Sequence, residues 1–209
     1  LFQADFDPDW LEWAQTLQAQ QNELFLDAVA GGWFATTGQD PSVLLRLKED
    51  QDGAEPSASS VSVLNLLTLS QLTGDDVSMK LVEGMLGRLN SASASPARTA
   101  PLMMAGLSVY HQSRPQVVVV GSRDAADTCA MLAALAKPYM PGMVVVFLEP
   151  GVHQSRMAEL LPFVRDMVML DGQATAYVCK EFVCAAPTTD VDVAIAAVGP
   201  RPAAGSDES

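Results

Sequence analysis

The sequence is poor in the residues that mark several familiar classes of protein. Its 209 residues include 3 cysteines and 2 histidines, and 12 lysines and arginines stand against 25 aspartates and glutamates. So few cysteines exclude a scaffold built on disulfides. A net charge of −13 argues against a nucleic-acid partner, because binding to phosphates depends on a basic face.

Long apolar runs and a recognisable targeting segment are also lacking. The longest apolar runs, such as Met143 to Leu148, have about six residues, whereas a membrane-spanning helix needs about 20. The acidic stretch from Leu1 to Trp10 has no basic region followed by an apolar one, so it is not a signal peptide. We expect a soluble piece of a longer precursor, without membrane contact, whose targeting segment would lie upstream of Leu1 and whose compartment the sequence does not assign.

The residues that are present are typical of a folded protein with a substantial core. Hydrophobic residues make up 49% and charged residues 18%, which is too apolar for a disordered chain. The acidic excess is uneven, since no lysine or arginine precedes Arg46. This acidic stretch is either a solvated surface or a docking face for a basic partner, and the second alternative predicts an interaction scaffold.

Apolar residues recur at helical spacing through the first half of the chain. Trp13, Leu17 and Leu24 lie in a predicted helix over about 10–26. Further helices are predicted over about 57–74, 75–89 and 99–111, the first two as an αα-hairpin. Residues 1–113 are therefore expected to be helical hairpins.

At Pro115 the pattern changes to that of a small α/β unit over 114–199. The β-branched run after Gln116 and the run from Met143 predict buried strands, and the helix predicted over 124–137 between them completes a βαβ crossover. A helix over about 154–163, a third strand over 175–179 and a short last helix follow. Residues 200–209 are expected to be a disordered tail.

Four carboxylates lie within seven residues, just before the helix predicted from residue 57. They are Glu49, Asp50, Asp52 and Glu55. Such a segment is a solvated turn and helix cap, a site for a sugar or another polar substrate in which carboxylates act as acid and as base or nucleophile, or a Ca²⁺ site. We take Asp50, Asp52 and Glu55 as candidate catalytic residues, and we assign no metal and no cofactor.

Three residues near these carboxylates are candidates for binding a substrate, namely Lys48, Ser57 and Trp33. An indole ring can stack on a sugar, but core packing of Trp33 is the alternative. The loop from Gly121 has one glycine and matches neither a dinucleotide fingerprint nor a P-loop. It is therefore a structural turn or an anion site at a helix start.

The cysteines predict no familiar redox or zinc motif. Cys179 and Cys184 are spaced C-x4-C rather than C-x-x-C, and His111 and His153 lack the paired spacing of zinc ligands. The pair is two structural thiols, a disulfide or redox pair, or part of a metal site, and we take both cysteines as redox candidates. Cys129, among apolar residues of a predicted helix, is expected to be a core thiol.

Three stretches together resemble the C-terminal part of the spermatogenesis-associated protein 20 family. They are LLRLKEDQDGAEPSASSVSVLNLLTLSQLTGD at 44–75, VVVVGSRDAADTCAMLAAL at 117–135 and LPFVRDMVMLDGQATAYVCKEFVCAAPTTD at 161–190. The resemblance implies a thioredoxin-fold domain, then an (α/α)6 barrel of the six-hairpin glycosidase type, then a small α/β region. Ser59 stands where the family usually has asparagine, and Lys180 and Glu181 stand where it usually has glutamate and asparagine.

The resemblance implies that this chain holds the terminal barrel hairpins and the α/β region, and three functions remain open. The first is a carbohydrate-active, glycosidase- or epimerase-like enzyme that binds a sugar or polar small molecule and is inactive as this fragment. The second is a redox or chaperone-like protein that works with an upstream thioredoxin-like domain of the same chain. The third is the scaffold with an acidic docking face.

Overall fold

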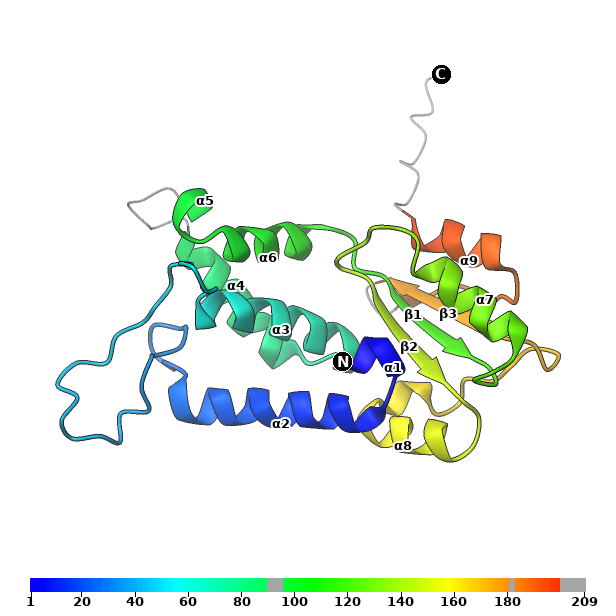
Figure 1. The fold of residues 1–209 in the computed structure, drawn as a ribbon, viewed down its shortest axis with the longest axis horizontal. Coiled ribbons are helices and arrows are strands. Elements are labelled where there is room, and N and C mark those ends of the chain that lie inside the picture. Colours follow the sequence, from blue (N-terminus) through cyan, green and yellow to red (C-terminus); the bar gives the residue numbers. More distant parts are fainter. Residues whose placement is uncertain (90–95, 181–182, 200–209) are drawn as a thin grey trace, which may run out of the picture. The chain divides into compact units, whose positions relative to one another are not determined.

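The computed structural model describes residues 1–89, 96–180 and 183–199, so the predicted tail over 200–209 lies outside the described residues. The chain divides into two compact units (Figure 1). The helical unit covers Asp9–Gln112, and the α/β unit starts at Ser113 and also takes in the N-terminal segment Gln3–Pro8. We describe each unit by itself.

The helical unit is built around one long central helix, α3. Its helices are α2 (Pro8–Phe25), α3 (Ala58–Thr73), α4 (Asp76–Leu89), α5 (Pro96–Thr99) and α6 (Pro101–His111). Ser57 caps the start of α3, since its hydroxyl accepts a hydrogen bond from the Ser60 N–H. At the end of α3, Gly74 adopts a left-handed conformation with φ 77°, which glycine does at little cost. The helices predicted over 57–74 and 75–89 are therefore present, and α3 packs against both α4 and α6.

The core of the helical unit lies where α3, α4 and α6 meet. Trp33, which is 2% exposed, packs with fully or almost fully buried side chains of these helices. They include Leu66, Leu67, Val82 and Met103. The apolar spacing that predicted the helices thus also marks the residues that form the core.

The helix α2 contributes little to that core. Over its 18 residues only Leu11 and Gln18 are buried. Trp13, Leu17 and Leu24 are 54%, 47% and 37% exposed, and their spacing of four and seven residues places them on one side of the helix. Within this unit α2 therefore presents an apolar stripe to solvent.

The α/β unit has a four-stranded mixed sheet in the order β2-β1-β3-β4. The strands are β1 (Gln116–Val120), β2 (Val144–Leu148), β3 (Thr175–Lys180) and β4 (Val183–Cys184), and the helices are α1 (Phe2–Asp5), α7 (Ala126–Leu135), α8 (Val152–Leu160) and α9 (Val191–Val198). β1 pairs in parallel with β2 and antiparallel with β3. The predicted βαβ crossover is confirmed, whereas β4 and α1 were not predicted.

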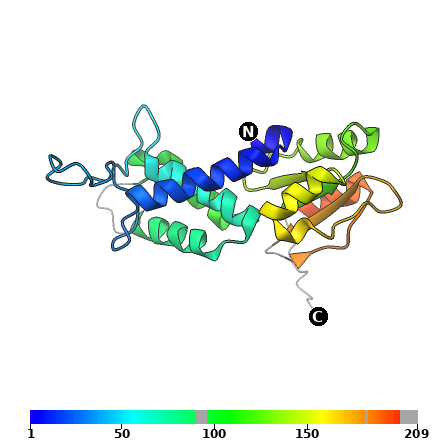
Figure 2. The same ribbon diagram turned by 90° about the horizontal axis from the view of Figure 1, so that it is seen from below.

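Helices cover both faces of this sheet. Figures 1 and 2 show α7 and α9 on one face and α8 on the other. On the face toward α7 and α9, Val117, Val119 and Val178 are at most 4% exposed. Gly121 follows β1 directly, and a Cβ atom at this position would collide with the Thr128 hydroxyl oxygen on α7, so only glycine permits this approach.

One cysteine differs from its prediction. Cys129 on α7 is an exposed free thiol, so the prediction of a core thiol is wrong. The buried side of α7 carries Thr128, Met131 and Leu135 instead. Among the described residues, no helix is both long enough and apolar enough to cross a bilayer.

Candidate functional site

The candidate site is the loop between the buried Trp33 and the start of α3 at Ala58, and its candidate residues lie between positions 48 and 57. Its first part is held by two cations that lie over one aromatic ring. The Arg46 guanidinium carbon lies 3.9 Å from the centre of the Phe34 ring, and the Lys48 Nζ atom lies 5.0 Å from it. Such cation–π contacts orient the chain before the carboxylates begin.

Lys48 is engaged by groups of the preceding turn. Its ammonium nitrogen lies 2.6 Å from the Asp27 carboxylate and donates a hydrogen bond of 2.6 Å to the Gly31 carbonyl. The Lys48 hydrogen bond, followed by those from the Ala30 and Val29 amides, lowers the pKa of Asp27 to about 2. Because the Lys48 side chain is only 13% exposed, it holds this turn rather than presenting a free charge to a ligand.

Asp50 lies between a serine of α3 and an arginine of α4. Its carboxylate accepts a hydrogen bond of 2.7 Å from the Ser59 hydroxyl and pairs at 3.1 Å with Arg88. The same guanidinium donates to the carbonyls of Ala30 and Gly31. Since the Asp50 and Arg88 side chains keep 35% and 36% of their exposure, this pair presents acceptor and donor groups together to solvent.

Asp52 joins the starts of two helices. One carboxylate oxygen accepts from the Ser57 amide at 2.8 Å and the other from the Leu102 amide at 2.7 Å. The helix α6 lacks a side-chain cap of its own, because Ala100 stands at that position, so Asp52 supplies one from 50 residues away.

The environment of Asp52 also sets its charge. Burial alone would raise the pKa of this carboxyl, but hydrogen bonds from the Ser57 amide, the Ser60 hydroxyl and the Leu102 amide outweigh it, and the pKa lies below the ordinary value. Asp52 is therefore ionised at neutral pH. A carboxylate in this state accepts hydrogen bonds or stabilises positive charge, and it does not serve as a general acid.

The remaining candidates divide between surface and interior. Glu55 is exposed, and its carboxylate meets no hydrogen-bonding partner in the described part of the chain. Ser57 is 6% exposed, and its hydroxyl donates a hydrogen bond to the Ser60 hydroxyl and accepts one from the Ser60 amide. Trp33 is buried in the core, where its ring N–H donates to the Asn22 side chain at 3.0 Å. The structure thus brings Asp50, Asp52 and Ser57 together at the start of α3.

Sequence reasoning missed the partners of these carboxylates. Arg88 follows Asp50 by 38 residues, and no local pattern connects them. Ser59 was visible only as a departure from the family pattern. Within residues 1–89, 96–180 and 183–199, no three His, Cys, Asp or Glu side chains are grouped so that they could hold a metal ion.

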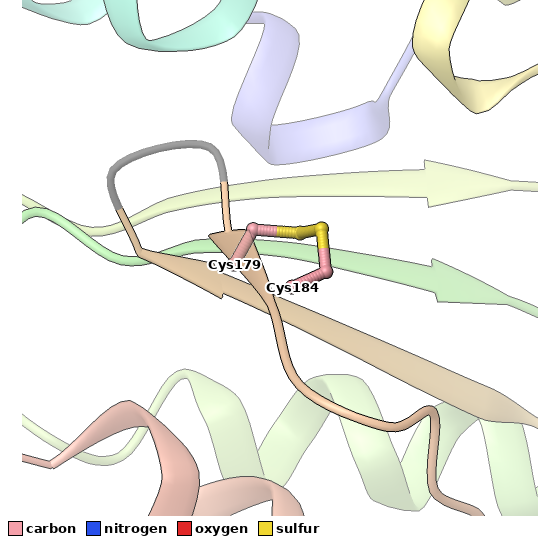
Figure 3. The surroundings of a disulfide bond; sticks show 2 residues. All are labelled: Cys179 and Cys184. Carbon is pink, nitrogen blue, oxygen red and sulfur yellow. A yellow bond between two sulfur atoms is a disulfide. The ribbon is translucent and has the colours of Figure 1, made fainter.

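The redox candidates lie in the α/β unit. Cys179 on β3 and Cys184 on β4 form a disulfide with an S–S distance of 2.02 Å (Figure 3). They face each other directly across the two strands, with α carbons 3.9 Å apart. Cys179 is 3% exposed, whereas Cys184 is exposed.

Comparison with known proteins finds relatives of this chain in one family. No protein-family model matches the chain. Spermatogenesis-associated protein 20 of Homo sapiens is 39% identical over 191 residues, which are 91% of this chain, and that of Rattus norvegicus is 37% identical over the same share. An uncharacterized protein of Caenorhabditis elegans is 27% identical over 75% of the chain. The chain spans about a quarter (24%) of the length of the human and rat relatives.

Proposed function

Because the chain matches the C-terminal part of the spermatogenesis-associated protein 20 family, we propose that it is one portion of a larger carbohydrate-active protein. In this proposal the helical unit forms the terminal hairpins of a six-hairpin glycosidase-like (α/α)6 barrel. The remaining barrel helices and a thioredoxin-like domain belong to the rest of such a polypeptide.

The exposed side of α2 supports this arrangement. Only two of its 18 residues are buried within the unit, although its apolar stripe of Trp13, Leu17 and Leu24 is suited to packing against further helices. In a six-hairpin barrel every hairpin has neighbours on both sides. An apolar stripe on a terminal hairpin would be covered by those neighbours.

The ligand proposed for the segment 48–57 is a sugar or another small molecule with neighbouring hydroxyl groups. One observation carries this proposal: Asp50 is held in place by Ser59 and Arg88 while about a third of its side chain stays exposed. A fixed carboxylate beside a fixed guanidinium offers acceptors and donors at defined spacing. Hydroxyl groups use both kinds of partner.

The carboxylates take different roles in this proposal. Asp52, ionised and bonded to two helix starts, positions the segment. Asp50 binds hydroxyl groups. Glu55, exposed on the same segment, is the residue left to exchange protons with a substrate.

The test uses a polypeptide of the relatives' full length, in which binding and turnover of a panel of mono- and oligosaccharides are measured. We expect Glu55→Gln to lower turnover by at least 100-fold and Asp50→Asn to weaken binding about tenfold, as the loss of one charged hydrogen bond would. Glu49→Gln, an exposed neighbour, is the matched control and should change neither.

The isolated 209-residue chain provides a second arm of the test. A barrel that lacks most of its helices cannot enclose a substrate, so this chain alone should show no turnover. Full activity of both Glu55→Gln and Asp50→Asn, or absence of binding across the sugar panel, would refute the proposed function.

A further inference from the structure

The disulfide of the α/β unit lies at the edge of the sheet. β4 is the last strand in the order β2-β1-β3-β4, and both of its residues are exposed. We propose that Cys179–Cys184 is a thiol–disulfide exchange site whose partner is a protein dithiol. This inference does not depend on the proposed sugar site.

The strand register places the two sulfurs at a position suited to reversible bonding. The Ala185 amide donates to the Val178 carbonyl at 2.9 Å, so the pair next to the cysteines carries the hydrogen bonds. Cys179 and Cys184 therefore occupy a non-hydrogen-bonded pair, where side chains of antiparallel strands approach most closely. Breaking the S–S bond removes no backbone hydrogen bond from the pair.

Access to the two sulfurs is unequal. Cys184 belongs to the exposed edge strand, whereas Cys179 is 3% exposed on β3. Figure 3 shows the bridge crossing from one strand to the other at this edge. An attacking thiolate reaches the sulfur of Cys184 first, and the buried sulfur of Cys179 is the leaving group.

The disulfide contributes little to the stability of the α/β unit. The two cysteines are five positions apart, and closing so short a loop constrains the unfolded chain less than closing a long one does. The core of the unit is formed by β1, β3, α7 and α9 through residues such as Val117, Met131 and Val178. Reduction should therefore leave the sheet and its helices in place.

The exchange proceeds in two displacements. A thiolate of the partner attacks the Cys184 sulfur, forming an intermolecular disulfide and releasing Cys179 as a thiolate, which takes up a proton. The second thiol of the partner, after losing its proton, attacks the partner's own sulfur in that bond and releases Cys184, which is also protonated. Two electrons pass from the partner, which leaves as a disulfide, to the cysteine pair, which becomes a dithiol. In the reverse sequence the dithiol reduces a partner disulfide and the Cys179–Cys184 bond forms again.

The first experiment uses the 209-residue chain carrying Cys129→Ser, so that only the proposed pair remains. Reduced dithiothreitol is added without denaturant, free thiols are blocked with N-ethylmaleimide, and the mass is measured. We expect two blocked thiols and an unchanged far-UV circular dichroism spectrum. Reduction that occurs only when the chain is unfolded would overturn the proposal and make the bond purely structural.

The second experiment identifies the attacked sulfur. A thioredoxin whose resolving cysteine is replaced by serine should accumulate as a mixed disulfide, and peptide mapping should place it on Cys184. Single thiols left by Cys179→Ser and Cys184→Ser, both in the Cys129→Ser background, should react with Ellman's reagent at rates that differ at least tenfold, with Cys184 the faster. No mixed disulfide, a mixed disulfide on Cys179, or a rate ratio near one would each refute the mechanism.

Discussion

Asp52 offers the sharpest test of how the candidate segment is built. Its carboxylate accepts hydrogen bonds of 2.8 Å and 2.7 Å from the amides of Ser57 and Leu102. Asp52→Ala removes both acceptors and leaves the first turns of α3 and α6 without this partner. The prediction is a large loss of stability from one surface-accessible loop residue.

The magnitude follows from the two hydrogen bonds. A hydrogen bond to a charged group contributes about 1.5–3 kcal/mol when it is buried. Because Asp52 is only partly buried, the lower figure applies to each bond, and we expect Asp52→Ala to lower the free energy of unfolding by about 3 kcal/mol. Asp52→Asn keeps one acceptor oxygen and should lose about half as much.

Urea unfolding followed by tryptophan fluorescence measures this loss. The three tryptophans, at positions 10, 13 and 33, all belong to the helical unit, so the signal reports the unit that contains Asp52. Glu55→Ala, an exposed carboxylate of the same segment, is the control and should change the free energy by less than about 0.5 kcal/mol. An Asp52→Ala effect as small as that of the control would refute the capping role.

The pH dependence gives the same prediction an independent check. The pKa of Asp52 is lowered in the folded chain, because hydrogen bonds outweigh burial. Its contribution is therefore complete above the unfolded pKa of about 3.9 and is lost as the pH falls through the lower folded pKa. The stability difference between wild type and Asp52→Ala should stay constant from neutral pH to about pH 4 and shrink below it. A difference that grows in acid would contradict the direction of the shift.

Three further predictions concern other parts of the chain. Gly121→Ala should destabilise the α/β unit by about 2 kcal/mol, because its Cβ would meet the Thr128 hydroxyl. Urea unfolding followed by circular dichroism measures the loss, and Thr128→Ala should restore part of it. Equal stability of Gly121→Ala and wild type would contradict this prediction. Lys48→Met should return the pKa of Asp27 from about 2 toward 3.8, which NMR titration of that carboxyl measures, and an unchanged pKa would show that Lys48 is not the main cause. Trp13→Gln should reduce self-association of the 209-residue chain in sedimentation experiments, since Trp13 is 54% exposed on α2; unchanged association would place the apolar contact elsewhere.

Local patterns in the sequence predict most of the helices and strands. The valine run from 117 to 120 is fully buried, as its lack of polar alternation predicts. Ser57 caps α3 and Asp190 caps α9, because short polar side chains satisfy the free amides of a first turn. These signals act within a few residues, so they can be recognised without the fold.

The relations that build the candidate site are not local. The bonds from Asp50 to Arg88 and from Asp52 to Leu102 span 38 and 50 residues, and nothing in the composition of either segment specifies the other. Cys129 shows the same limit on a smaller scale. It has apolar neighbours in the sequence, but the buried side of its helix contains Thr128 and Met131. Which side of α7 is buried depends on how the helix packs on the sheet.

The acidic segment has a structural role as well as the proposed chemical one, and a test of its function has to separate the two. Asp52 bonds to two helix starts, so a loss of activity in Asp52→Asn could arise from a displaced segment as readily as from missing chemistry. The Glu55 carboxylate has no hydrogen-bonding partner among the described residues, and the Glu55 carbonyl keeps its bond from the Gly53 amide. Glu55→Gln therefore changes the charge of an exposed group without removing a side-chain contact. If both variants lose activity but only Asp52→Asn loses stability, the activity depends on the carboxylate of Glu55 itself and on the placement that Asp52 provides. If activity follows stability in every variant of the segment, the carboxylates belong to the fold alone.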